Sequence, residues 1–527
     1  MAFALSLAAA LLALAAPAAS QAATGDFDGN GFDDLAIGTP DEDVGAASVD
    51  AAGAVNVLYG RATGLSARGD DLWTQDSPGV RGVAEDGDHF GAALASGDFD
   101  GDGFDDLAIG APSEDLTTAG GVEADAGAVS VLYGSGDGLR VAGNQSLRQH
   151  PDAPGGGLQA GAAFGSALLA TDFNRDDGRD ELVVGAPRQD ISDAGGPNPD
   201  AGVVAIVTGR SDGLAPGSAL VLSQGGAEVE GDDLFGSSLT AGTFTGDRFP
   251  DLVLGAIGED EGGAFDTGSL LIFLNVGTTT ALAGPFTQED IGSLVESNDR
   301  FGDALVAADF GRSGRNNLAI GMPREDVGST ADAGVVVVVY TESGELDWAN
   351  PDSFLATDVG DAVEASEAFG ASLAALDLTF GPQTDLAVGV PLENSPTAAD
   401  HGAVGVIPGD DEGLSHAGGG SFTQDPIGDA EEPGDLFGAT LAAGRFGRGP
   451  RDDLAIGSPW ETLGTTSQAG LVHTAFGEVG PFGPLDSQRW HQNRRGVRES
   501  AAPGDHFGTA LAPPGAGGPF DLLGPTR

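Results

Sequence analysis

The chain has 527 residues, of which 81 are Asp or Glu and 22 are Lys or Arg, giving a formal net charge of -59 at pH 7. Such a surface repels nucleic acid and anionic membranes, so we expect neither as a partner. A chain of this length is too long to fold around a single hydrophobic core of ordinary size, which predicts several domains or a repeat array. The chain has no cysteine, which excludes disulfides and thiol catalysis.

Residues 1–22 are rich in Ala and Leu and end in small residues. This segment resembles a secretory signal peptide, which predicts a mature chain over residues 23–527 and a secreted or cell-surface location. The basic residues that usually open a signal are missing, which leaves a short membrane anchor or a misplaced start as alternatives. No later run is long and apolar enough to cross a bilayer, so we expect no transmembrane segment after the signal.

An acidic loop followed by a short apolar strand recurs along the chain. In the copy that reads GDFDGDGFDDLAIGAP, Asp98, Asp100, Asp102 and Asp106 alternate around a glycine turn. Oxygen ligands at alternate positions, with glycine at the sharp turn, suit a cation of calcium size. The Gly-x-Pro segment that ends the strand recurs at near-constant spacing, starting at Gly38, Gly110, Gly185, Gly321, Gly389 and Gly457, with a degraded copy at Gly255. Seven copies predict a repeat architecture.

Each copy carries four strand signals separated by Gly-rich and Asp-rich turns, and no useful segment of helical period follows residue 22. This repeat predicts an all-β fold, a seven-bladed β-propeller of four-stranded antiparallel blades over residues 23–527. A spare strand signal at Phe507-Gly508 stands near the C-terminal end, whereas copy one begins at its loop. We therefore expect the N- and C-terminal strands to pair in one shared blade and close the ring.

The Phe-Gly pair, the DxDxDGxxD loop and the Gly-Ala-Pro segment together resemble the FG-GAP repeat of the integrin alpha-subunit β-propeller and its bacterial relatives. The resemblance covers about residues 24–524. It implies seven blades, a ligand-binding face, and calcium in the loops between the first two strands of some blades. In this chain we expect about three Ca²⁺ ions, in copies one to three.

The implied calcium ligands are the residues of three loops. In copy one they are Asp26, Asp28, Asn30, the carbonyl of Phe32, and Asp34. In copy two they are Asp98, Asp100, Asp102, the carbonyl of Phe104, and Asp106. In copy three they are Asp172, Asn174, Asp176, Gly178 and Asp180. Copy three holds one extra residue before its strand, which leaves Glu181 as an alternative to Asp180.

The loops of copies four to seven depart from the pattern. Copy seven has Arg445 at the first ligand position and keeps Asp453, so we expect the arginine to neutralise that carboxylate in place of a metal. In copies one to three calcium is expected to stabilise the fold, because carboxylates crowded in one loop repel each other until a cation neutralises them. Ordinary acidic turns are the alternative, since Asp and Gly favour turns by themselves.

Other charged groups also repeat. Acidic residues such as Glu114 follow the Gly-x-Pro segments and others such as Asp88 precede Phe-Gly, as repeated turn chemistry or as a rim for a cationic partner. His89 and His506 occupy one repeat position, which repetition explains more simply than catalysis. We expect the basic aromatic segment 489–495 to balance local acidity, with a contact site as the alternative.

The sequence contains no GxSxG, HExxH or phosphate-binding glycine loop. We therefore expect a monomeric, non-catalytic binding or adhesion module with an extracellular protein or polysaccharide ligand. The long loops after the second strands, at 43–54, 116–126 and 190–202, would gather on one face and carry specificity. The alternative is a calcium-dependent hydrolase or lyase acting on extracellular polysaccharide, because a catalytic carboxylate pair could be hidden among so many acids.

Overall fold

The computed structural model describes residues 25–45, 49–149, 157–174, 178–192, 196–225, 229–247, 249–275, 280–378, 381, 383–477 and 486–512. The expected signal peptide, residues 1–22, lies outside these ranges, as does the ligand candidate Asp176. Within the described residues, no helix has the length and apolar character needed to cross a membrane. Helical structure there is limited to short 3-10 turns, η1 (Pro216–Ser218), η3 (Gln288–Ile291), η4 (Ala356–Val359) and η5 (Asp425–Ile427).

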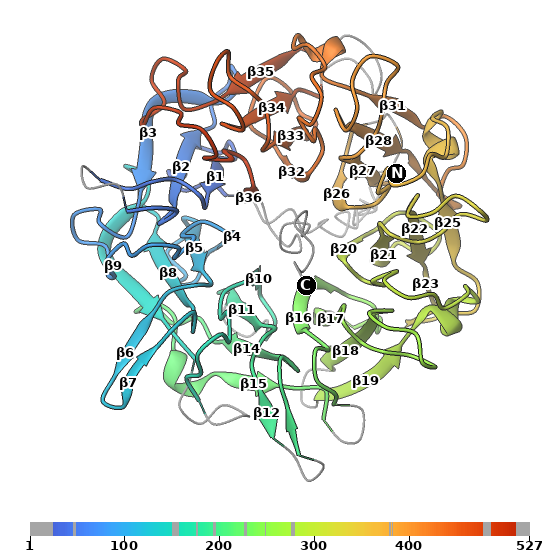
Figure 1. Ribbon diagram of the computed structural model, residues 1–527, viewed down its shortest axis with the longest axis horizontal. Coiled ribbons are helices and arrows are strands. Elements are labelled where there is room, and N and C mark those ends of the chain that lie inside the picture. Colours follow the sequence, from blue (N-terminus) through green and yellow to red (C-terminus); the bar gives the residue numbers. More distant parts are fainter. Residues whose placement is uncertain are drawn as a thin grey trace, which may run out of the picture.

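Seven four-stranded antiparallel sheets stand around a common centre in the described part of the chain (Figure 1). The strands nearest the centre are β36 (Ala510–Ala512), β4 (Ala93–Gly97), β10 (Ala167–Thr171), β16 (Phe235–Gly242), β20 (Ala304–Ala308), β26 (Ser372–Leu376) and β32 (Thr440–Gly444). The second strands are β1 (Leu35–Thr39), β5 (Asp106–Ala111), β11 (Glu181–Ala186), β17 (Asp251–Ala256), β21 (Asn317–Met322), β27 (Asp385–Val390) and β33 (Asp453–Ser458). The predicted seven-bladed propeller is confirmed.

The remaining strands complete the blades outward. The third strands are β2 (Ala54–Tyr59), β8 (Ala128–Tyr133), β14 (Val203–Val207), β18 (Ser269–Asn275), β22 (Val335–Val339), β28 (Ala403–Ile407) and β34 (Leu471–Ala475). The outer strands are β3 (Ser66–Trp73), β9 (Arg140–Leu147), β15 (Leu220–Leu222), β19 (Thr280–Phe286), β25 (Asp352–Phe354), β31 (Gly420–Phe422) and β35 (Ser487–Trp490). Two-stranded hairpins branch from four connections: β6 (Leu116–Thr118) with β7 (Gly121–Glu123), β12 (Ile191–Ser192) with β13 (Pro197–Asn198), β23 (Thr341–Glu342) with β24 (Glu345–Leu346), and β29 (Gly409–Asp410) with β30 (Gly413–Leu414).

The ring closes through the two ends of the chain. Strand β36 pairs antiparallel with β1, with Leu511 opposite Ile37, so the first blade takes its inner strand from the C-terminal end. A second contact joins blades 7 and 1, because the backbone N–H of Arg445 donates to the Asp33 carboxylate at 2.6 Å. The N–H of Asp33 returns a bond to the Arg445 carbonyl at 3.0 Å. Closure of this kind removes the open sheet edges.

The Phe-Gly and Gly-x-Pro residues form the contact between blades. The second strands are buried along their whole length, as their apolar sequence predicts. A Cβ atom on Gly110 would lie 2.2 Å from the Gly165 carbonyl oxygen of the next blade. Gly165 itself has a φ of 97°, which L side chains rarely adopt. Glycine at both positions therefore allows the backbones of neighbouring blades to touch.

Antiparallel order gives the ring two chemically distinct faces. We call lower face the one formed by the loops from inner to second strands and from third to outer strands. The loops from second to third strands, including the hairpins β6–β7 and β12–β13, form the upper face. All candidate metal loops lie on the lower face, and the long variable loops lie on the upper face.

Candidate metal sites

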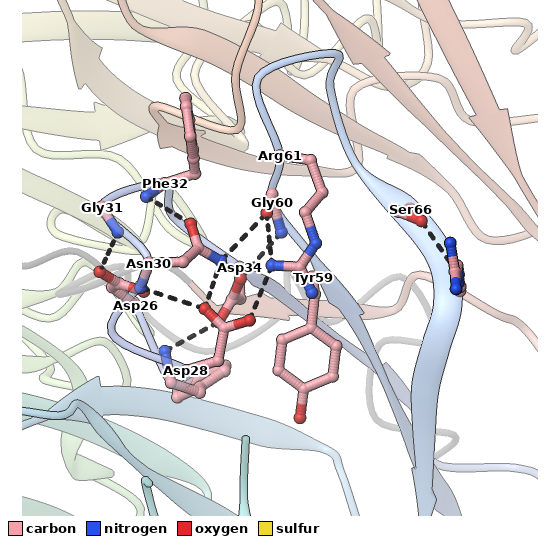
Figure 2. Close-up of polar contacts among 12 residues, drawn as sticks. Asp26, Asp28, Asn30, Gly31, Phe32, Asp34, Tyr59, Gly60, Arg61 and Ser66 are labelled. Atoms are coloured by element: carbon pink, nitrogen blue, oxygen red, sulfur yellow. Dashed lines mark hydrogen bonds and ion pairs between the residues drawn. The ribbon is translucent and has the colours of Figure 1, made fainter. Parts of the chain in front are cut away.

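The loop before β1 is shaped by its own side chains (Figure 2). The Asp26 carboxylate accepts backbone N–H bonds from Asn30 at 2.9 Å and from Gly31 at 2.7 Å. The Asn30 side-chain oxygen accepts from the N–H of Phe32 at 3.0 Å. Gly31 has a φ of 86°, so glycine permits the tight turn. These bonds hold the side chains at alternate positions of the loop, those of Asp26 and Asn30, on one side of the turn.

Asp34 anchors the loop to its blade. Its two carboxylate oxygens accept from the N–H groups of Phe27 and Gly60, each at 2.8 Å, and the side chain is buried. Asp28 faces it from the loop and forms an ion pair with Arg61 at 2.7 Å. Figure 2 shows Asp26, Asp28 and Asp34 surrounding one small volume.

This first loop can hold a hard cation. One carboxylate oxygen each from Asp26, Asp28 and Asp34 lies within 4.8 Å of the others. Burial, together with the charges of Asp28 and Asp26, raises the pKa of Asp34 to about 9. The three charges can coexist only if a cation or a proton neutralises them, and an all-oxygen ligand set suits Ca²⁺. The residues present therefore fit the expected ion.

The loop between β4 and β5 repeats this geometry. The Asp98 carboxylate accepts from Gly101 at 2.7 Å and from Gly103 at 3.0 Å. Asp106 accepts from two backbone N–H groups at 2.9 Å each, and burial raises its pKa to about 8. Oxygens of Asp98, Asp100 and Asp106 again lie within 4.8 Å of one another.

The other two predicted residues of this second loop have defined places. The Asp102 side-chain oxygen accepts from the N–H of Phe104 at 3.1 Å. Arg140, on the outer strand of the same blade, lies 3.2 Å from the Asp102 carboxylate and 3.9 Å from that of Asp100. Ligation through the carbonyls of Phe32 and Phe104 stays a prediction.

The third loop is built differently. Glu181 lies opposite Thr171 in the β10–β11 pair, as Asp106 lies opposite Gly97 in β4–β5. Its carboxylate accepts from the Asn174 N–H at 3.1 Å and from the Asn174 amide at 2.6 Å. The extra residue in this copy therefore puts Glu181 in the register of the last ligand.

Asp180 occupies the preceding position and contacts the neighbouring blade. Its carboxylate accepts from the backbone N–H of Asp98 at 3.0 Å, as Asp105 accepts from Asp26 at 2.9 Å. Of the remaining predicted residues, Asp172 and Gly178 lie within the described part of this loop. Metal binding in this third loop stays a prediction.

Blades 4 to 7 keep only the anchor of the loop. In each, the residue that matches Asp34 accepts a buried backbone N–H at 2.8 to 3.1 Å: Asp251, Asn317, Asp385 and Asp453. Among the described residues Arg445 forms no ion pair with Asp453, so the expected neutralisation is wrong. The backbone of Arg445 is used instead in ring closure, and one carboxylate oxygen of Asp453 accepts from the N–H of Gly477. The last position of the loop is therefore structural in every blade.

The upper face carries buried carboxyl pairs that the sequence showed only as acidic repeats. In blade 5, the Gln288 amide nitrogen donates to Asp299 at 3.0 Å and to Glu325 at 2.6 Å. Burial and the proximity of the two acids raise the pKa of Glu325. Equivalent glutamines contact acids in other blades: Gln75 with Glu114, Gln224 with Glu259, Gln424 with Glu461 and Gln492 with Glu42.

These glutamines distinguish the pairs from metal loops. Oxygens of Glu432, Asp435 and Glu461 also lie within 4.8 Å of one another, but the Gln424 amide donates to Glu461 at 2.8 Å. The amide satisfies one acid of this cluster, and Asp435 and Glu461 are buried, whereas Asp26 and Asp28 in the first metal loop are partly exposed. The recurring Thr-Gln dipeptide at Thr287-Gln288 and Thr423-Gln424 was the sequence signal for this contact.

The two repeated histidines meet on one acid. His506 Nδ1 lies 2.7 Å from one oxygen of Asp41, and His89 Nε2 lies 3.5 Å from the other. His506 precedes the inner strand of blade 1 and His89 precedes that of blade 2. The contact therefore joins blades 1 and 2 on the upper face, which repetition in the sequence did not reveal.

Comparisons with known proteins agree with this architecture. The FG-GAP repeat family matches residues 18–58 and 90–132, which contain the first two candidate metal loops. These two segments are FG-GAP repeats, and the chain that carries them folds as a β-propeller. This FG-GAP propeller is 32% identical to integrin alpha-PS2 of Drosophila melanogaster over 247 residues, 45% of this chain and 15% of the integrin. It is 33% identical over 166 residues to a phosphatidylinositol-glycan-specific phospholipase D of Rattus norvegicus, covering 31% of this chain and 18% of that protein.

The matches to curated relatives thus span only 15% to 20% of the length of those proteins. Among solved structures, an exotype rhamnogalacturonan lyase is similar over 83% of this chain and 72% of its own, with 13% identity and a TM-score of 0.36.

Proposed function

We propose that this FG-GAP propeller binds calcium on its lower face and works outside the cell as a binding or adhesion module. The observation that carries the proposal is the convergence of three carboxylates within 4.8 Å in each of two adjacent loops. Both loops lie inside the segments that match the FG-GAP family. The loop of copy three would bind a third ion through Asp172, Asn174 and a carboxylate at its end.

The calcium would act on stability. The first loop leads into the second strand β1 and the second loop joins β4 to β5, so neutralising their carboxylates stabilises the start of the second strand in each blade. The ligand itself, an extracellular protein or polysaccharide, would bind the upper face. The hairpins β6–β7 and β12–β13 project from the rim of the ring there and differ from one blade to the next (Figure 1). We expect the propeller to be monomeric and exported.

Thermal unfolding tests the calcium sites. The midpoint is measured in about 2 mM Ca²⁺ and in excess chelator at fixed ionic strength. A site with a dissociation constant near 0.1 mM should add roughly 2 kcal/mol at that concentration, and several sites should add visibly. Mg²⁺ and Na⁺ at matched ionic strength are the controls. An equal rise with every salt would show that the loops are ordinary acidic turns.

Glycan and protein binding arrays, run beside a substrate-depletion assay on polysaccharides, test the binding function. We expect stoichiometric binding without turnover. The alternative, a calcium-dependent polysaccharide hydrolase or lyase, predicts that substrate disappears with catalytic turnover. Depletion that is lost in chelator would therefore replace the binding module by that enzyme.

A further inference from the structure

A cavity of about 830 Å³ lies between the segment 427–432, which leads into blade 7, and the outer strand β35. Its walls include the three arginines Arg448, Arg489 and Arg494, together with His491. The formal net charge of the chain is -59, so a wall with three arginines is a local exception. Carboxylates also line it, which makes the cavity polar and of mixed charge.

Two of the three arginines have carboxylate partners. Arg489 Nη1 lies 2.9 Å from Asp429, and Arg448 forms an ion pair with Asp486. The buried His473 ring stands 3.6 Å from the other oxygen of Asp429. The charge of Asp429 is therefore already paired with Arg489. This part of the cavity agrees with the expectation that the basic segment balances local acidity.

Arg494 does not fit that expectation. It has no ion pair with a carboxylate among the residues that the structure describes. Its guanidinium lies over the ring of the buried Trp490, 3.8 Å from the centroid, and donates to the carbonyl of Arg489. The neighbouring His491 Nδ1 is shielded from solvent and has no hydrogen-bond partner. Arg494 is thus a guanidinium held in one place, close to the second cation Arg489, which is an arrangement suited to an anion.

We propose that this cavity binds a sugar acid that carries a single carboxylate, with the carboxylate against Arg494. Guanidinium and carboxylate match in a planar, two-bond geometry. The wall carboxylates Asp429 and Glu432 would accept hydrogen bonds from sugar hydroxyls, whereas they would repel an acidic peptide. A polymer with an acid on every residue is disfavoured by the charge of the whole protein. The inference rests on the proposed binding function and names its ligand class.

The test uses two probes of nearly equal size, methyl glucuronide and methyl glucoside, which differ at C6. Binding to the full chain in calcium is measured by calorimetry and by tryptophan fluorescence, since Trp490 lies beneath Arg494. We expect the glucuronide to bind at least about tenfold more tightly than the glucoside. Arg494→Gln should lower the glucuronide affinity to that of the glucoside. The exposed Arg68→Gln on β3 is the matched control and should change nothing.

Equal affinity for the two probes, no binding of either, or an unchanged affinity in Arg494→Gln would overturn the proposal. The calcium-dependent unfolding midpoint of each variant, measured in parallel, shows whether the fold is intact. Arg494→Lys adds a second check, because it keeps the charge without the planar fork and should bind with intermediate affinity. An array ligand that binds wild type and Arg494→Gln equally would end this proposal and leave the binding function standing. Turnover of a glucuronide-bearing substrate would end the non-catalytic function and leave the cavity assignment standing.

Discussion

Carboxylates crowd together on both faces of this propeller, but their neighbours differ. On the lower face, Asp98, Asp100 and Asp106 approach within 4.8 Å around a glycine turn, and the nearest donors are backbone N–H groups. On the upper face, Asp299 and Glu325 share the amide of Gln288 at 3.0 and 2.6 Å. A cation can neutralise the first arrangement, whereas a proton and an amide satisfy the second.

Accessibility separates the two arrangements further. Asp98 and Asp100 are partly exposed, so an ion can reach them from solvent, whereas Asp299 is 2% exposed and Glu325 is 7% exposed. The density of acidic residues therefore does not identify a metal site in this chain. Access of the carboxylates to solvent, and the glycine turn that brings them together, separate the two arrangements.

The largest expected effect comes from the last position of the lower-face loop, where a side-chain oxygen accepts a backbone N–H in every blade. Asp106→Ala removes the acceptor of two buried N–H groups, those of Phe99 and Gly134. We expect a loss of about 3 kcal/mol or more in unfolding free energy in chelator, and a larger loss in calcium, because the variant also loses a carboxylate of the metal loop. Urea unfolding monitors it.

Asp106→Asn is the matched control for that substitution, because Asn317 fills the same position in blade 5 and accepts from Phe310 at 2.9 Å. This variant should keep most of the stability in chelator and lose the calcium response. If Asp106→Ala proved harmless in chelator, the anchor role of this position would be wrong.

The second largest effect separates the contribution of side-chain charge to calcium binding from that of hydrogen bonding within the loop. The double variant Asp100→Asn with Asp102→Asn keeps the side-chain oxygens that accept from Asp102 N–H and Phe104 N–H at 3.1 Å. We expect it to lose roughly 2 kcal/mol of calcium-dependent stabilisation and to match wild type in chelator. Calcium titration followed by unfolding midpoint measures both quantities.

Asp247→Asn, in the lower-face loop of blade 4, serves as the control for the double variant. That loop has no cluster of three carboxylates among its described residues, so the substitution should leave the calcium response unchanged. A calcium response that fell equally in both variants would mean that calcium acts on the charge of the whole surface.

The smallest effect belongs to the upper face and depends on pH. Burial raises the pKa of Glu114 from 4.5 to about 7, and that of its neighbour Asp88 to about 6. The folded state therefore binds more protons than the unfolded state. The stabilisation is complete below pH 4.5 and is lost as pH rises through about 7.

Glu114→Gln should flatten this pH dependence and stabilise the protein at pH 8 relative to wild type, by an amount on the order of 1 kcal/mol. The slope should be the same in calcium and in chelator, because the pair needs no ion. Unfolding at pH 5 and pH 8 measures it, with the exposed Asp137→Asn as control. A slope that depended on calcium would place a metal on the upper face and remove the distinction between the faces.

The repeat and the loops could be predicted from the residues alone because their chemistry is local. The spacing of Phe-Gly and Gly-x-Pro predicts the blades, and the spare strand at Phe507 predicts the closure that β36 and β1 confirm. Alternate acids around a glycine turn place Asp26, Asp28 and Asp34 around one volume, since a tight turn leaves few other arrangements.

Side-chain contacts between blades depend on how the blades are arranged in the ring, so no local sequence pattern predicts them. Gln288 reaches Glu325 across 37 positions of sequence, and His506 reaches Asp41 across 465. Strand register decided that Glu181, rather than Asp180, takes the place of the last ligand. Arg489 pairs with a carboxylate because the segment that carries Asp429 packs beside β35, which the sequence of 489–495 does not reveal. These features follow from how the sheets stand around the ring, because only that arrangement brings distant side chains within hydrogen-bond distance.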